Sequence, residues 1–417
     1  MRPLLVAALA CAFAIAPVRA QRLSALAPAP DWSDIDAFQE TITRAEFTRL
    51  LETIYAPGQS AAGVIEIADD SVAIRKNLVP GDTFTLRFAK DVAGAKSVPR
   101  FWHPKSTTAD AAHPLAGVKI ALDPGHLGGE WAKMEERWFQ LGESVPVTEG
   151  DMTLHVAKLL APQLAALGAE VSFVRANPGP VTLLRPSDLR DAARADLLFQ
   201  GHADSPETYS GPGDPRRGES VQFRSEMLFF RTAEIRERAV LVNTRLQPDL
   251  VLCLHFNADA WGEPDAPIFT ASNHLHALLN GAYSAGELHN DDVRHDMLVK
   301  LLTRTADEEL AANTAIVQTL ARRLALPPYI YTRDIAIRPA ASPYVWARNL
   351  LANRLYRCPV VFLEPYEMNN REVWERIQAG DYEGMREVAG GTRPSLFREY
   401  ADGVAAGLRD YFAPPPR

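Results

Sequence analysis

Three short apolar runs each end on a side chain that can bind a metal ion or transfer a proton. They are residues 118–122 before Asp123-Pro124-Gly125-His126, residues 250–254 before His255, and residues 359–363 before Glu364. Short apolar runs bounded by turn residues are typical of buried, parallel strands. In open α/β sheets, ligands bind beyond the carboxyl ends of such strands. The pattern therefore predicts that two histidines and a carboxylate meet at one edge of a sheet.

Helical periodicity alternates with these apolar runs. Residues 152–167 form an amphipathic pattern that ends at Gly168 and contains Pro162, and residues 170–175 follow as a strand. A strand, a helix and a second strand predict a parallel, right-handed βαβ unit. Further helices are expected at residues 232–244, 296–324, 343–355 and 372–412. The predicted fold is α/β, with a mixed, largely parallel sheet flanked by helices.

A different pattern precedes this unit. Residues 35–55 have helical spacing, and short strand patterns follow at residues 64–67, 72–74 and 84–88. We therefore expect a small α+β domain of unknown role at residues 21–115, before a catalytic domain at residues 116–417.

The second domain contains an expected insertion at residues 177–230, which is irregular at its centre. Residues 205–218 are dense in proline, glycine and charge. Long structureless segments in compact domains are usually functional insertions or mobile loops. Two hypotheses remain open: the insertion gates a cleft until a regulatory activator protein displaces it, or it is a solvated loop.

The first 20 residues resemble a secretory signal peptide. Arg2 precedes an apolar stretch from Leu4 to Ala16, and Val18-Arg19-Ala20 offers a small-residue cleavage site. The stretch is too short to span a bilayer, so we predict export to the periplasm or the extracellular space and no transmembrane segment. Acylation at Cys11 is the less favoured alternative, because few apolar residues precede it.

Net charge and cysteine content narrow the class of protein. The formal net charge of −8 argues against nucleic acid or an anionic membrane as the main partner. After removal of the leader, Cys253 and Cys358 remain, both in or beside buried strands. Export permits a disulfide, but we favour free, buried thiols. Cys253 shares a strand face with His255, so a cysteine ligand is also conceivable.

Glu149 is a candidate carboxylate, because it lies where the loop that starts at the His126 turn returns to the sheet, so the two side chains could share one ion. A carboxylate at a helix start also complements the helix dipole, which is the structural alternative. Other residues compete for these positions. Glu135, Glu136 and Glu143 lie in the same loop, His202 also follows an apolar run, and His274 and His276 fit a structural or substrate-side position better.

The candidate set suits one kind of metal chemistry. Two neutral histidines and one carboxylate leave an open coordination position, which is typical of catalytic zinc (Zn2+). A glutamate at the end of a neighbouring strand, here Glu364, could take a proton from a water molecule and return it to a leaving amine.

Several of these segments resemble, in the same order, motifs of the zinc-dependent N-acetylmuramoyl-L-alanine amidases. The similar segments are residues 120–126, 149–154, 167–175, 238–243, 249–258 and 359–364, with Asn370 six residues later. The resemblance implies zinc held by His126, Glu149 and His255, with Glu364 as the catalytic acid and base. It also implies a peptidoglycan hydrolase that cleaves the amide bond between N-acetylmuramic acid and L-alanine.

Parts of the chain depart from the amidase pattern. Residues 177–230 are longer than the usual connection, residues 273–287 replace a glycine-led strand, and residues 21–115 lie outside the resemblance. One alternative is a different zinc amide hydrolase or peptidase of the cell envelope. Another is a non-catalytic protein that binds the cell wall.

Overall fold

A six-stranded sheet forms the centre of the molecule. The computed structural model describes residues 22–77, 79–105 and 111–413, so the predicted leader and Cys11 lie outside the described residues. The strand order is β10-β9-β11-β8-β4-β7. The strands are β4 (Lys119–Pro124), β7 (Glu170–Phe173), β8 (Leu250–Leu254), β9 (Leu275–Leu279), β10 (Val345–Ala347) and β11 (Val360–Pro365).

Strand direction confirms the predicted mixed, largely parallel sheet. Strands β7, β4, β8 and β11 are parallel, whereas β9 is antiparallel to β11 and β10 follows the direction of β9. Leu254 of β8 is in register with Pro124 of β4 and with Leu363 of β11. The three predicted strand ends therefore meet at one edge of the sheet.

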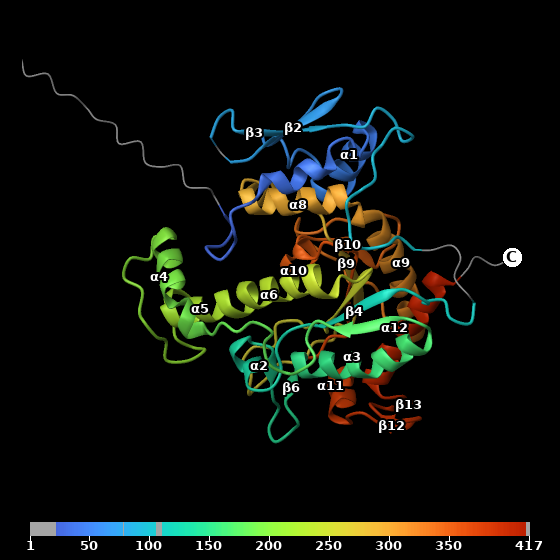
Figure 1. Ribbon diagram of the computed structural model, residues 1–417. Coiled ribbons are helices and arrows are strands. Elements are labelled where there is room, and N and C mark those ends of the chain that lie inside the picture. The colour runs from blue at the N-terminus through green and yellow to red at the C-terminus, as the bar shows by residue number, and fades with distance from the viewer. Residues whose placement is uncertain (1–21, 78, 106–110, 414–417) are drawn as a thin grey trace, which may run out of the picture.

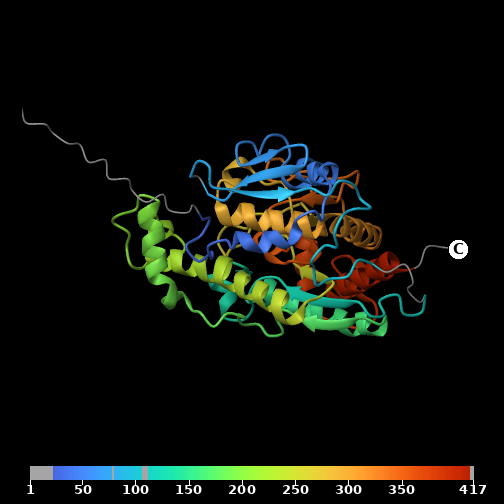
Figure 2. The same cartoon turned by 45° about the horizontal axis from the view of Figure 1, so that its top comes forward.

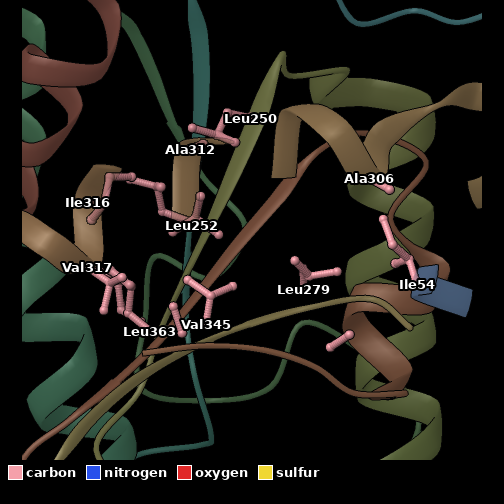
Figure 3. Packing of buried hydrophobic residues seen from close by; sticks show 14 of the residues in the cluster. Ile54, Leu250, Leu252, Leu279, Ala306, Ala312, Ile316, Val317, Val345 and Leu363 are labelled. Carbon is pink, nitrogen blue, oxygen red and sulfur yellow. The ribbon is translucent and has the colours of Figure 1, made fainter. Parts of the chain in front are cut away.

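Helices cover both faces of this sheet, and the strand side chains alternate between them. Leu122, Leu252 and Leu363 belong to one apolar cluster with Ile316 of α9 (Thr305–Leu324). This face also carries α3 (Glu149–Ala166) and α12 (Leu396–Phe412). Figure 3 shows Leu252 and Leu363 beside Ile316 and Val317. The opposite face packs against α6 (Glu234–Leu241) and α10 (Leu351–Leu355).

The N-terminal residues form a small unit that packs on α8 (Asp291–Thr303) (Figures 1 and 2). Its sheet has the order β1-β2-β3 and is antiparallel, as β1 (Ile65–Ile67), β2 (Ser71–Arg75) and β3 (Thr83–Arg87). The prediction of a single helix over residues 35–55 is wrong. The chain instead forms the 3-10 helix η1 (Trp32–Phe38), the α-helix α1 (Arg44–Leu50) and the π-helical turn η2 (Leu51–Tyr55). The break arises because Glu40 adopts a left-handed backbone and Thr43 caps a new helix.

This unit shares its hydrophobic core with the large sheet. Ile54 lies in the same apolar cluster as Leu279 and Ala306 (Figure 3). The backbone N–H groups of Ala282 and Tyr283 donate to Ile54 O and Tyr55 O, at 2.8 and 2.7 Å. The boundaries of the two domains remain a prediction, and the shared core implies that the two units stabilise each other.

The insertion contains more regular structure than the sequence suggests. It includes η3 (Pro186–Leu189), α4 (Arg190–Phe199), η4 (Arg217–Glu219) and α5 (Val221–Leu228). Helix α5 continues through η5 (Phe229–Ala233), α6 and η6 (Val242–Leu246). Leu189, Ala193, Leu197 and Phe229 form a separate small apolar cluster that holds these helices together. Residues 200–216 remain irregular, as expected.

Two other helical predictions need correction. Residues 343–355 are not one helix, because Val345 pairs with Ala277 and makes β10 an edge strand before α10 begins. Residues 296–324 belong to two helices, since Arg304 is left-handed at φ 59° and separates α8 from α9.

The remaining elements are short or lie in the C-terminal tail. They are α2 (Trp131–Met134), β5 (Trp138–Phe139), β6 (Val147–Thr148), α7 (Ala285–Leu288), α11 (Arg371–Gln378), β12 (Arg386–Val388) and β13 (Gly391–Arg393). The β12–β13 hairpin interrupts the helical tail predicted for residues 372–412. Within the described ranges, no helix is long and apolar enough to cross a membrane.

Candidate metal centre and active site

His126, Glu149 and His255 come together at the shared edge of β4 and β8. One ligand atom from each residue lies within 4.8 Å of the others. Glu149 is central, because its Oε2 lies 3.3 Å from His126 Nε2 and its Oε1 lies 3.3 Å from His255 Nδ1. The two imidazole rings are 5.0 Å apart and nearly perpendicular. This donor set, two imidazoles and a carboxylate, fits a catalytic zinc site.

Backbone geometry explains how the strand ends deliver the histidines. His126 follows β4 in a left-handed conformation at φ 59°. A Cβ atom on Gly125 would overlap the ring of His255, so the close approach of the two strand ends requires glycine there. Thr153 Oγ1 donates to Gly125 O at 2.8 Å and ties this turn to α3.

Glu149 is the first residue of α3 and is almost completely buried. Its Oε1 accepts a hydrogen bond from Phe256 N at 3.0 Å. Burial alone raises the pKa of Glu149, but the opposing effects of His126, His255 and Arg137 lower it to about 2. The carboxylate is therefore charged at neutral pH, as a metal ligand must be.

Glu135 lies behind His126 rather than among the ligand atoms. Its Oε1 is 2.7 Å from His126 Nδ1, and its Oε2 accepts from Leu127 N at 2.6 Å. A carboxylate on the far nitrogen orients a metal-binding histidine and makes it a better donor. Sequence spacing left Glu135 as a rival ligand, and the structure places it against the ring of the candidate ligand His126. Of the other rivals, Glu136 pairs with Arg217 at 2.5 Å and Glu143 is exposed.

Arg137 is a site residue that no sequence pattern indicated. Its Nε lies 3.3 Å from His126 Nε2 and 3.4 Å from Glu149 Oε2. It stands in a loop of mixed charge, where neither spacing nor periodicity distinguishes it from Lys133 or Glu136. Only the folded loop brings this cation to the candidate ligands.

Glu364 occupies the neighbouring strand end and is ionised differently from Glu149. Phe362, two residues earlier in β11, stacks on His255 with ring centroids 4.2 Å apart. Burial, reinforced by the negative charge of Glu149, raises the pKa of Glu364 to about 8. One carboxylate is therefore a permanent anion while its neighbour can hold or release a proton, which is the division that acid–base catalysis requires.

His276 lies opposite Glu364 in the antiparallel pairing of β9 and β11, so both side chains project from one face. Tyr331 Oη lies 3.2 Å from His276 Nε2, and Arg348 Nη1 donates to the same hydroxyl at 3.3 Å. Burial lowers the pKa of His276 to about 3, so this histidine is neutral. It borders the site without joining the candidate ligands.

The other sequence candidates lie outside the ligand group. His274 Nδ1 is 3.5 Å from Glu367 Oε1, and His202 lies 3.9 Å from Glu219 in the insertion. Burial, then the charge of Asp123, raises the pKa of the Cys253 thiol well above its usual value, which disfavours the thiolate that metal binding needs. Cys253 and Cys358 are both free and buried, which confirms the preference for unpaired thiols.

The sequence matches no protein-family model and no curated protein. Among solved structures, an N-acetylmuramyl-L-alanine amidase from Mycobacterium smegmatis is 16% identical, with a TM-score of 0.35 over 72% of this chain and 98% of that chain. The corresponding amidase from Mycobacterium abscessus is 16% identical, with a TM-score of 0.36 over 71% and 99%. The CwlD amidase from Clostridioides difficile, in complex with the GerS lipoprotein, is 12% identical, with a TM-score of 0.36 over 71% and 98%.

Proposed function

We propose that the protein is a zinc-dependent N-acetylmuramoyl-L-alanine amidase. The observation that carries this proposal is the meeting of His126, Glu149 and His255 within 4.8 Å, beside Glu364 on the adjoining strand. In the proposed reaction, water cleaves the amide bond between N-acetylmuramic acid and the L-alanine of the stem peptide. The amidase-like motifs of the sequence support this choice of substrate.

His126 through Nε2, Glu149 through its carboxylate and His255 through Nδ1 would hold the zinc ion. When bound, zinc would polarise the substrate carbonyl and lower the pKa of a water molecule toward ~7. Glu135 would hold the ring of His126 in the orientation that directs Nε2 toward Glu149.

Glu364 would carry the proton. In its ionised form it would accept a proton from the attacking water, and in its protonated form it would donate that proton to the departing nitrogen of L-alanine. Its raised pKa suits this exchange because both forms are accessible near neutral pH. Arg137, which contacts both His126 and Glu149, would offset the negative charge that accumulates among these carboxylates.

Export would bring the enzyme to its substrate. The signal-peptide pattern of residues 1–20 supports delivery to the periplasm or the extracellular space, where peptidoglycan lies.

Digestion of purified peptidoglycan, with metal analysis of the same protein sample, tests the function. We expect about one zinc ion per chain and the release of intact stem peptides that begin with a free L-alanine amino group. Mass spectrometry of the products separates the alternatives. Shortened stem peptides would instead indicate an envelope peptidase, and binding to sacculi without products, by zinc-replete protein, would indicate a non-catalytic binding protein.

We further propose that the insertion regulates this site through the loop that carries Arg137. Arg217 of the insertion forms an ion pair with Glu136, the residue between Glu135 and Arg137. The Arg217 guanidinium also lies 4.2 Å from the ring centroid of Phe223, which holds it in place. An activator protein that displaces residues 205–218 would therefore change the loop that supports His126.

Deletion of residues 205–218 tests this regulation. If the insertion gates the site, the deletion variant should have higher basal activity than the unmodified protein. Arg217→Gln should produce a smaller change in the same direction. Arg194→Gln is a matched control, because Arg194 pairs with Glu207 inside the insertion and not with the loop. Unchanged activity in a folded deletion variant would favour a solvated loop.

A further inference from the structure

A cavity of about 270 Å³ lies between the insertion helices and α10, and it shares no residue with the candidate metal centre. Four of its lining residues are arginines, whereas only one, Glu287, is acidic. We call it the arginine cavity, and its arginines are Arg224 of α5, Arg231 of η5, Arg236 of α6 and Arg354 of α10. Its apolar lining consists of Leu23, Met227, Leu228 and Leu351.

Carboxylates outside the lining form ion pairs with three of these arginines. Arg224 pairs with Asp196, Arg236 Nη2 lies 3.7 Å from Asp292, and Arg354 Nε lies 3.4 Å from Asp296. None of these three aspartates lines the cavity. These acids balance the charges of the arginines without occupying the lining of the cavity.

Donor groups remain unused at this cavity. Arg354 is 3% exposed, and its Nη1 donates to Asn349 Oδ1 at 2.8 Å. In the part of the chain that the structure describes, Arg354 Nη2 and Arg236 Nε have no hydrogen-bond partner. Buried donors are normally satisfied by protein, water or a ligand. Arg231 adds an exposed guanidinium, with no carboxylate within 4.0 Å among the described residues.

The acid in the lining does not satisfy these donors. Glu287 Oε1 accepts from Asn349 Nδ2 at 2.8 Å, and its Oε2 accepts from the backbone N–H and the hydroxyl of Ser284 at the start of α7. It therefore stabilises a helix cap and a neighbouring amide. Among the described residues, Arg236 Nε, Arg354 Nε and Arg354 Nη2 have no hydrogen-bond partner, and an anion in the cavity would supply one.

We propose that the arginine cavity binds a small anion through Arg231, Arg236 and Arg354. The planar forks of arginine match the oxygen pairs of carboxylate and phosphate groups, so the ligand carries at least one such group. A volume of about 270 Å³ suits a compact ligand rather than a polymer. Leu228 and Leu351 offer contact for a short apolar part of the same molecule.

Titration calorimetry with inorganic phosphate and with succinate, at constant ionic strength set by chloride, tests this site. We expect saturable binding of one equivalent of at least one probe, and the preferred probe identifies the ligand class as phosphate or carboxylate. Arg231→Met should weaken that binding at least tenfold, because one charged hydrogen-bond donor is lost. Since Arg231 is exposed, this variant should keep its fold, which its thermal unfolding curve checks.

Arg338→Met is the matched control, because Arg338 is an exposed arginine that stacks on Trp346 away from the cavity. It should leave the affinity for the probe unchanged. Arg354→Lys, which keeps the charge but loses the fork, should also weaken binding. Absence of saturable binding to the unmodified protein, or equal affinity in the Arg231→Met and Arg338→Met variants, would overturn the proposal. This measurement does not depend on turnover of peptidoglycan, so it tests the arginine cavity separately from the proposed function.

Discussion

Two clusters of buried charge lie next to each other at the end of β4, and they differ in how completely they are paired. In the first, which we call the closed cluster, Arg238 contacts Asp123 at 2.9 Å and Glu234 at 2.7 Å. Tyr356 donates to the second oxygen of Asp123 at 2.5 Å. The second, which we call the open cluster, contains the candidate ligands and Glu364. Among the described residues, Glu364 has no cation within 4.0 Å.

The difference in pairing distinguishes a cluster that supports the fold from a cluster whose groups can exchange protons. Burial alone lowers the pKa of Arg238, but Asp123 and Glu234 raise it far above its usual value, so its charge is permanent. Arg238 also donates to Pro124 O and His126 O, at 3.0 and 3.2 Å, and thereby holds the turn that presents His126. The open cluster instead keeps pKa values near 2 and near 8 on two neighbouring carboxylates. Complete pairing makes a scaffold, and incomplete pairing leaves groups free to react.

The largest effect is expected from Glu364→Gln, which removes the unpaired acid and keeps its shape. Turnover of peptidoglycan should fall by roughly 10²–10⁴-fold, the range for loss of a general acid and base. Zinc content, measured by elemental analysis, should stay at the level of the unmodified protein. Loss of zinc would make Glu364 a ligand, and unchanged turnover would remove it from the mechanism.

Breaking the closed cluster should mainly affect folding. Arg238→Met leaves Asp123 and Glu234 buried without their cation, which should lower the free energy of unfolding by about 3–5 kcal/mol. Chemical denaturation measures this change. Arg49→Met is the control, because the Arg49–Asp307 pair is exposed and should contribute at most about 1 kcal/mol. Equal losses in the two variants would contradict the scaffold role.

A smaller effect is expected where one residue supports the open cluster from behind. Glu135→Gln removes the charge next to His126 Nδ1 and should weaken zinc binding by roughly 10–100-fold, as is common for such supporting carboxylates. Competition with a chelator of known affinity measures the change. Glu143→Gln, an exposed acid in the same loop, should leave the affinity unaltered. If both variants bind zinc as tightly as the unmodified protein, Glu135 has no supporting role.

At neutral pH the smallest effect concerns His276, which is buried and neutral beside the site. Because burial lowers its folded-state pKa to about 3, its contribution to stability is complete above pH ~6.5 and is lost as the pH falls toward 3. His276→Phe should remove up to about 1.4 kcal/mol per pH unit from the acid-side slope of unfolding free energy. Unfolding curves between pH 7 and 4 measure that slope. A slope that survives the substitution would assign the acid sensitivity to other groups.

The fold was predictable where a short pattern determined its own structure. The apolar runs before His126, His255 and Glu364 are buried strands in the expected parallel arrangement. The prediction for residues 343–355 was wrong because β10 depends on pairing with β9, a partner about 70 residues earlier in the chain. The helical content of the insertion was underestimated for a related reason, since its helices are held by apolar contacts with each other.

The same distinction holds within the candidate site. His126, Glu149 and His255 could be proposed from the sequence, because each stands at the end of a strand or the start of a helix. Arg137 and the supporting position of Glu135 could not, since both depend on the path of the loop between β4 and α3. The arginine cavity could not be predicted either, because three of its arginines come from the continuous segment α5–η5–α6 and the fourth comes from α10, far along the chain.

The sequence by itself determined which residue types reach the edge of the sheet, because strand periodicity and turn glycines are local properties of the chain. Tertiary structure alone decided which of those residues share a charge environment. Glu149 and Glu364 are chemically alike, yet their pKa values are about 2 and about 8. That separation arises from burial and from the distances to His126, His255 and Arg137, which exist only once the strands and the loop have packed together.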